Sequence, residues 1–325
     1  MINEADWAPL ETVAPGAGVA YRRLAGGSAG PLFLGVRHPD HQRRLVYRYA
    51  VGAHQPDLPQ CKGVRTSVEH GAEGLEVVLA LTAMVHADVF NALAGDIATA
   101  VHDASSDDEG LALLLDRLLR WQRLLDAVPQ DGLDANYRRG LYGELLILEQ
   151  IVSPAVGPAA AVSAWTGPAR AHQDFQLPNG AVEVKTTAGK RPQRLTITNE
   201  RELDASHLQV LLLAFVILDE RLGGTGESLN ERVDRVRALS FPAGNLDARL
   251  TEYGYLGEHH DLYDEPRYSV RGSEFWHVTE GFPCIVEADL PPGVGDVRYQ
   301  LSVEALQPFV VDAHEAVVAL QGSQT

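Results

Sequence analysis

Three ionisable residues of the types needed for phosphate chemistry lie close together in the segment HQDFQLPNGAVEVKTT. They are Asp174, Glu183 and Lys185, and they belong to two short strand-like runs. An Asn-Gly pair between alternating runs is a strong hairpin signal, because a type I′ turn needs a positive φ at both central residues. With residues 179–180 at the turn, counting outward places Asp174 opposite Lys185, with Glu183 on the same face. We therefore predict a patch of two carboxylates and one ammonium.

The uncharged side chains explain why this hairpin would fold. Alternation along the strands gives the other face four apolar residues: Phe175, Leu177, Val182 and Val184. That face must be buried, which leaves the charged face for water or a ligand. The simplest alternative to a functional site is a solvated ion pair between Asp174 and Lys185, worth roughly 0.2–1 kcal/mol.

The predicted patch has the chemistry of a divalent-metal site. Two carboxylates a few ångströms apart repel each other unless a cation lies between them. Mg²⁺ suits such a pair, because it binds through one or two carboxylates while water and substrate phosphate fill its other positions. Mn²⁺ is the alternative ion. A bound metal ion lowers the pKa of its water, and a lysine on the same face can stabilise charge that develops on the phosphate.

The spacing resembles the D…(D/E)-x-K signature of the PD-(D/E)XK nuclease superfamily, since eight residues separate Asp174 from a Glu-x-Lys triplet. The resemblance implies that Asp174 and Glu183 bind divalent metal and that Lys185 assists the attacking water. It also implies a further metal-binding acid on the preceding helix, where Glu144 in RRGLYGELLILEQ is similar in position. The residue before the Asp is often Pro in that superfamily and is Gln173 here.

A closer resemblance covers most of the chain beyond residue 135. The ordered segments GLYGELLILEQ, SAWTGP, QDFQL…VEVKTT, GESLNERVDRVRALS and FWHVTEGFP are similar to one bacterial PD-(D/E)XK motif protein family. Members of that family are encoded beside cytosine methyltransferases and ATPase subunits in restriction-type phage-defence loci. The resemblance implies a Mg²⁺-dependent DNA endonuclease that acts with such subunits, and a homodimer is an alternative assembly.

Basic residues gather directly after the hairpin. KTTAGKRPQRLTITNER has five bases against one acid, whereas the whole chain has a net charge of −17. An acidic chain cannot coat nucleic acid by bulk electrostatics, so any polyanion must bind locally. We expect Lys190, Arg191 and Arg194 to contact the phosphate backbone, with solvated loop charges as the simpler alternative.

Periodicity and breaker residues predict the elements that position these side chains. Residues 1–104 are expected to form an α+β domain of unknown role, with strands at VAYRRL, GPLFLGVR, RLVYRYAV and LEVVLALT and a helix at 85–104. The loop-like SSDDEG suggests a boundary, so residues 105–325 are expected to form the nuclease-like domain. Its predicted elements are helices at 111–128, 135–152, 230–239 and 243–256 and strands at 194–198, 208–218, 267–280 and 296–303. This order predicts an α/β fold with a restriction endonuclease-like core, a mixed central sheet flanked by helices.

Composition limits the other functional classes. The chain has 325 residues, 45% of them hydrophobic and 22% charged, which is typical of a globular protein. Cys61 and Cys284 are its only cysteines, so no disulfide framework is expected. MINEADWAPLETV lacks the layout of a secretory signal, and the longest apolar run, at 208–218, is too short to span a membrane. We expect a cytoplasmic protein with no membrane partner.

Two rival functions remain open. The first is a non-catalytic scaffold or sensor subunit that keeps the nuclease fold, although scaffolding does not require an acid–acid–lysine set. The second is a nuclease that acts on RNA or on single strands. Trp165 and Trp276 could stack on bases, but large aromatic residues are more often part of the core.

Overall fold

The computed structural model resolves the chain into two compact units. It describes residues 2–322 except for 13–17, 25–30, 50–55, 72–73, 128–130, 170, 191–193 and 240–243. The first unit comprises Met1–Gly132 with Gly254–His259, and the second comprises Leu133–Tyr253 with His260–Thr325. The units divide later in the chain than residue 104. The domain boundary expected after residue 104 remains a prediction.

The first unit contains a five-stranded antiparallel sheet in the order β1-β2-β3-β5-β4. Its strands are β1 (Gly18–Arg23), β2 (Leu32–His38), β3 (Gln42–Tyr49), β4 (Val64–His70) and β5 (Leu75–Leu81). The four strands predicted from sequence correspond to β1, β2, β3 and β5. The sequence analysis missed β4, because this edge strand reads VRTSVEH and lacks the apolar content of a buried strand.

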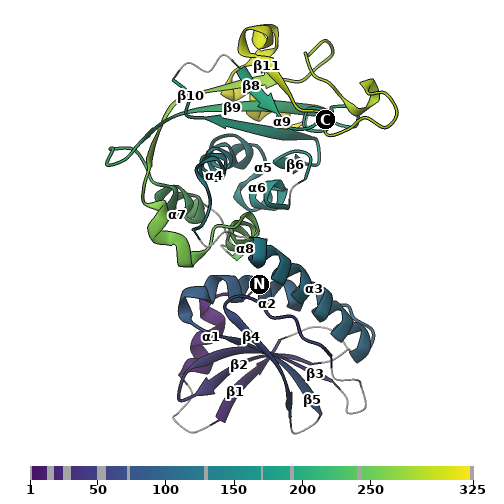
Figure 1. Cartoon of the computed structure of the whole chain (residues 1–325), viewed down its shortest axis with the longest axis vertical. Coiled ribbons are helices and arrows are strands. Elements are labelled where there is room, and N and C mark those ends of the chain that lie inside the picture. The colour runs from purple at the N-terminus through teal and green to yellow at the C-terminus, as the bar shows by residue number, and fades with distance from the viewer. Residues whose placement is uncertain are drawn as a thin grey trace. The chain divides into compact units, whose positions relative to one another are not determined.

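Three helices cover one face of this sheet (Figure 1). They are α1 (Glu4–Glu11), α2 (Ala87–Val101) and α3 (Asp107–Ala127). The Arg43 guanidinium on β3 pairs with Glu4 and Glu11 of α1, and the Tyr47 hydroxyl donates a hydrogen bond to the Asp107 carbonyl of α3. Side chains alternate along a strand, so Arg44, Val46 and Arg48 of β3 point to the opposite face.

The second unit contains a five-stranded sheet in the order β12-β10-β9-β7-β6, and this sheet is mixed, as predicted. Its strands are β6 (Phe175–Leu177), β7 (Gly180–Thr187), β9 (Val210–Arg221), β10 (Arg267–His277) and β12 (Val310–Val311). The pair β7–β9 is parallel and the other pairs are antiparallel. The β9 strand is buried along most of its length, as the continuous apolar run at 208–218 predicted.

Both faces of this sheet are covered (Figure 1). Helices α4 (Ala135–Ile147), α5 (Ser153–Val156) and α6 (Pro158–Ala164) lie on one side, with a π-helical turn, Leu148–Val152, after α4. The two-stranded sheet of β8 (Arg194–Ile197) and β11 (Tyr299–Ser302) lies on the other side. Helices α7 (Leu229–Leu239), α8 (Gly244–Tyr253) and α9 (Ala313–Gln321) complete the unit. The predicted mixed sheet flanked by helices is confirmed.

Helix α4 approaches β7 through a glycine. A Cβ atom at Gly143 would lie 1.9 Å from the Thr186 hydroxyl, so no larger residue fits at that contact. The helix begins at the cap residue Asp134, whose carboxylate accepts hydrogen bonds from the Asn136 and Tyr137 amides. The contact at Gly143 sets how closely α4 lies against β7, and the Asp134 cap sets where α4, which bears Glu144, begins.

The predicted hairpin is present, but its predicted register is wrong. The turn consists of residues 178–179, so that Leu177 pairs with Gly180 and Phe175 pairs with Val182. Neither Asn179 nor Gly180, both within the described part of the chain, has a positive φ. A Cβ atom at Gly180 would lie 2.3 Å from the Val210 carbonyl oxygen. Glycine is therefore needed here for close packing against β9, and proline at 178 presets the turn.

The error shifts the pairing by two residues, which leaves the faces unchanged because side chains alternate with a period of two. Glu183 and Lys185 therefore still share one face of β7. Asp174 lies one residue before β6 and is not opposite Lys185. The expected solvent exposure was also wrong, since both Glu183 and Val182 are buried.

No single helix in the described ranges is long and apolar enough to cross a membrane. One bent pair, Ala135–Val156 with Pro158–Ala164, meets that test by length and composition only.

Candidate active site

Lys185 joins two buried glutamates on β7 and on the segment after β8. Its ammonium lies 2.7 Å from Glu183 Oε1 and 2.6 Å from Glu202 Oε2. The exposed fractions are 4% for Glu183 and 5% for Glu202. The structure therefore shows two buried ion pairs in place of the solvated pair between Asp174 and Lys185.

Glu202 was not predicted from the sequence. Its carboxylate oxygens each lie 3.2 Å from the Thr198 amide and also accept a hydrogen bond from the Thr198 hydroxyl. The only sequence signal was an acid shortly after the basic segment. Contact with Lys185 depends on how β8 and its following turn pack against β7, which no local spacing reveals.

Asp174 is held by backbone groups on both sides. Its Oδ2 atom accepts a hydrogen bond from the Val184 amide at 2.8 Å. Its carbonyl accepts bonds from the amides of Thr166 at 2.8 Å and Gly167 at 3.0 Å. The carboxylate therefore stays beside β7 even though Asp174 precedes the strand ladder.

Glu144 reaches the same region from α4 and is held by two aromatic side chains. Its Oε2 accepts a hydrogen bond from the Trp165 indole at 2.7 Å, and its Oε1 accepts one from the Tyr253 hydroxyl at 3.0 Å. The rings of Trp165 and Tyr253 stack with centroids 6.0 Å apart. Trp165 and Trp276 are fully buried, so the expectation that both belong to the core is confirmed.

Gly167 shows that Glu144 and Asp174 border one small space. A Cβ atom built on Gly167 would lie 2.5 Å from Glu144 Oε2 and 3.1 Å from Asp174 Oδ1. A side chain at this position would therefore push at least one carboxylate away. Glycine here leaves room between two acids that come from separate elements.

Burial perturbs the protonation of these groups. It raises the pKa of Asp174 to about 6, against the lowering effects of Lys185 and the Val184 amide. Burial, followed by repulsion from Asp174, raises the pKa of both Glu144 and Glu183 well above the usual range. Burial alone would lower the pKa of Lys185, but the two adjacent glutamates outweigh it and raise that pKa. The ammonium therefore stays protonated at neutral pH.

We call Glu144, Asp174, Glu183, Lys185 and Glu202 the acid–lysine cluster. Four carboxylates and one ammonium leave three uncompensated negative charges when all five groups are ionised. A buried excess of negative charge is removed by protons or by a cation. The donor atoms are hard carboxylate oxygens, which suit Mg²⁺ or Mn²⁺.

The cluster is not a closed metal cage. Among the residues that the structure describes, no three His, Cys, Asp or Glu side chains are grouped so as to enclose an ion. Mg²⁺ needs only one or two carboxylates, because water and substrate phosphate supply its remaining ligands. Asp174 and Glu183 fit that requirement. Glu144 is close enough to Asp174 that repulsion between the two carboxylates raises the pKa of Glu144.

The structure brings Asp174, Glu183, Lys185 and Glu144 together, as the sequence analysis expected. The three basic residues are less defined: Lys190 and Arg194 are exposed, and Arg191 lies outside the described residues. The Lys190 carbonyl accepts a hydrogen bond from Arg271 at 2.9 Å, which ties this segment to β10. Their contact with phosphate remains a prediction.

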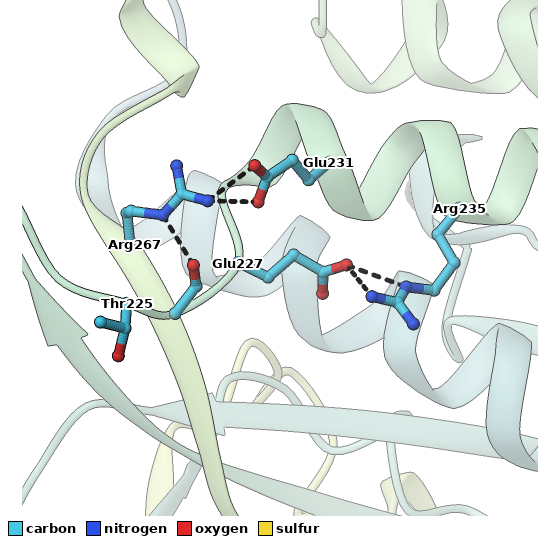
Figure 2. A pocket seen from close by; sticks show the side chains of 6 residues that line it. Thr225, Glu227, Glu231, Arg235 and Arg267 are labelled. Atoms are coloured by element: carbon cyan, nitrogen blue, oxygen red, sulfur yellow. Dashed lines mark hydrogen bonds and ion pairs between the residues drawn. The ribbon is translucent and has the colours of Figure 1, made fainter.

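A second group of charges lines an open pocket of about 560 Å³ between α7 and the start of β10 (Figure 2). Arg267 pairs with Glu231 at 2.5 Å, and Arg235 pairs with Glu227 at 2.7 Å. Glu227 also pairs with the buried Arg232. The charges are paired within the pocket, and none of its lining residues belongs to the acid–lysine cluster. We interpret it as an ion-pair network that holds α7 in place.

A family model described as "Putative PD-(D/E)XK family member, (DUF4420)" matches residues 3–304. No curated protein and no solved structure matches the chain.

Proposed function

Because the chain belongs to this PD-(D/E)XK family, we propose that it is a divalent-metal-dependent endonuclease that hydrolyses phosphodiester bonds in DNA. Family membership indicates a nuclease-like fold, and the mixed sheet flanked by helices agrees with it. The observation that carries the proposal is the acid–lysine cluster, which would have three more negative than positive charges if all five groups were ionised. A cluster that served only to stabilise the fold would be expected to balance its charges.

Asp174 and Glu183 are the residues proposed to hold Mg²⁺, or Mn²⁺ in its place, with Glu144 as the outer acid. Such an ion, when bound, polarises a phosphoryl oxygen and lowers the pKa of a bound water. The backbone bonds to Asp174 and the indole and phenol bonds to Glu144 keep these carboxylates in fixed positions. Because these carboxylates are already in place, they need to move less during the reaction.

Lys185 is proposed to act as a charge and a hydrogen-bond donor and not as a base, because its raised pKa keeps it protonated. Its ammonium orients the attacking water and stabilises the negative charge that develops on the phosphate oxygens. The water loses a proton to solvent and its oxygen bonds to phosphorus, while the bond to the leaving oxygen breaks and that oxygen takes a proton from solvent. Glu202 holds the ammonium together with Glu183 and acts as a positioning residue.

We further propose that Lys190, Arg191 and Arg194 bind the DNA backbone near the cluster. The wider setting is a cytoplasmic restriction-like defence system, in which ATPase and methyltransferase subunits act with this chain and a homodimer is the alternative assembly. The acidic charge of the chain, −17 overall, supports a role for other subunits in delivering DNA.

The test is cleavage of plasmid and oligonucleotide DNA with Mg²⁺ by wild type, Asp174→Ala and Lys185→Ala. Glu304→Ala is the matched control, because Glu304 is an exposed acid outside the cluster. Wild type and the control should cleave DNA, and the other two variants should not. Equal cleavage by all four proteins would refute the site assignment.

The same assay separates the rival functions. No cleavage by wild type, even with the neighbouring gene products added, would favour a scaffold or sensor subunit. Cleavage of RNA or single strands without cleavage of duplex DNA would favour the second rival.

A further inference from the structure

One face of the sheet in the first unit carries arginine and aromatic side chains and is contacted by none of the helices described in that unit. The strand register places Tyr21, Gly35, Arg44, Ala80 and Arg65 in one row across all five strands. Helices α1 and α3 pair with Arg43 and Tyr47, which point to the opposite face. Figure 1 shows these helices on one side of the sheet.

We call this surface the arginine face. Counting Asp40, which pairs with Arg37 just beyond β2, this surface has an excess of two positive charges. Its charged strand residues are five arginines and two glutamates: Arg23, Arg37, Arg44, Arg48, Arg65, Glu69 and Glu76. The chain as a whole has a net charge of −17, so this local excess runs against the overall balance. A positive surface on an acidic protein is complementary to a polyanion.

Some of these arginines are held by acids and others are not. The buried Arg44 pairs with Glu69 at 3.1 Å, Arg48 pairs with Glu76 at 2.7 Å, and Arg37 pairs with Asp40. The side chains of Arg23 and Arg65 have no ion-pair or hydrogen-bond partner among the residues the structure describes, and Arg65 is exposed. Two guanidinium groups are therefore available to a ligand.

Aromatic rings lie beside this charge. Tyr21 is 39% exposed and meets Phe33 edge to face, with ring centroids 6.0 Å apart. The Arg48 guanidinium lies 4.2 Å from the Phe33 ring centroid and 5.2 Å from that of Tyr21. Phe33 packs on an apolar strip of Val46, Val78 and Ala80 at the centre of the face. The strip supports the rings from below.

We propose that the arginine face binds single-stranded nucleic acid. Unstacked bases lie on aromatic rings and guanidinium planes, while nearby cations bind the phosphates. A flat sheet offers such a platform, but it does not enter a duplex groove as a helix or a two-stranded ribbon does. The inference does not rest on the proposed cleavage activity, because it uses none of the acid–lysine cluster.

The test is binding of fluorescein-labelled oligo-dT of about 16 nucleotides to the full chain in EDTA, by anisotropy at several salt concentrations. The variants are Arg23→Gln/Arg65→Gln and Tyr21→Leu. The control is Arg120→Gln/Arg123→Gln, which removes two exposed arginines from α3 in the same unit. Circular dichroism checks that each variant is folded.

The double variant should weaken binding and lower the salt slope by roughly 1.4, since each phosphate contact to a single strand contributes about 0.7. Tyr21→Leu should weaken binding about tenfold with an unchanged salt slope, because stacking does not involve charge. The control should bind like wild type.

Three outcomes would overturn the inference: equal binding by both test variants and the control, tighter binding of duplex DNA that the same variants lose, or equal displacement of oligo-dT by poly-glutamate. The last two would assign the face to duplex DNA or to an acidic protein segment. If Asp174→Ala loses cleavage but still binds oligo-dT like wild type, the binding proposal and the nuclease proposal are tested independently.

Discussion

The acid–lysine cluster beside β7 is rich in acids and the arginine face of the first unit is rich in bases, and the two also differ in burial. The three glutamates of the cluster are buried, and Asp174 and Lys185 are half-buried. Its carboxylates are held by protein groups, as Glu144 is by Trp165 and Tyr253. On the arginine face, Arg65 is exposed to water. Solvent screens charges there over about 10 Å, whereas buried charges are screened far less.

This difference in burial distinguishes a site suited to catalysis from a surface suited to binding. Burial shifts the pKa values of the cluster acids, which is typical of groups that hold metal or move protons. The arginine face shows charge together with aromatic surface, which is typical of salt-dependent association. Substitutions in the cluster should therefore change rates and pH profiles, while substitutions on the arginine face should change affinity and its salt dependence.

The largest effect is expected for Lys185→Met, which keeps the length of the side chain and removes its charge. We expect the cleavage rate at saturating DNA to fall by about 10²–10³, because a donor aimed at developing charge is lost. Steady-state kinetics should show an unchanged KM. A rise in KM at constant kcat would mean that Lys185 contributes to DNA binding and not to the chemical step. It would then act as the arginine face is expected to act.

A pH-dependent loss of stability is expected from Asp174. Its folded-state pKa of about 6 exceeds its ordinary value of 3.8, so the folded protein binds this proton more tightly than the unfolded chain. The resulting stabilisation is complete below about pH 4 and is lost as pH rises through about 6. Relative to Asp174→Asn, wild type should lose about 2 kcal/mol of unfolding free energy over that window.

Urea unfolding in EDTA between pH 4.5 and 7.5 measures this difference. Comparison with the variant removes contributions from titrating groups that do not interact with Asp174. Parallel stability curves for the two proteins would mean that Asp174 is not buried as described.

Glu202→Gln should have a smaller effect, because Lys185 keeps its pair with Glu183. We expect kcat to fall about tenfold with KM unchanged. The alkaline limb of the rate profile should move to lower pH, since Glu202 contributes to the raised pKa of Lys185. Glu304→Gln is the matched control. An unchanged pH–rate profile would mean that Glu202 only holds Thr198 and does not affect Lys185.

The smallest effect is expected for Gly167→Ala. Its new methyl group would lie 2.5 Å from Glu144 Oε2 and push that carboxylate away. We expect cleavage to fall about fivefold while the protein stays folded. Gly272→Ala is the control, because a Cβ atom there meets nothing within 4 Å. Equal activity of the two variants would show that the position of Glu144 does not matter.

The sequence predicted those site residues whose relation is local or follows a known order. Glu183 and Lys185 share a face because they are two residues apart on one strand, and that relation survived an error in the register. The register itself was wrong because Gly180 serves the contact with Val210, which belongs to a strand about thirty residues later in the chain. Turn chemistry alone could not reveal that requirement.

The remaining site residues depend on tertiary packing. Glu202, Trp165 and Tyr253 come from three separate elements, and no spacing links them to β7. The arginine face was hidden for a similar reason. Tyr21 and Arg65 belong to different strands and share a row only through the pairing of the five strands.

The central claim is that the acid–lysine cluster binds a divalent ion, and Mn²⁺ binding followed by electron paramagnetic resonance tests it without substrate or partner subunits. Wild type should bind Mn²⁺, Asp174→Asn should bind it at least about tenfold more weakly, and Lys185→Met should retain binding because its negative ligands remain. Equal Mn²⁺ affinity for wild type and Asp174→Asn would contradict the account.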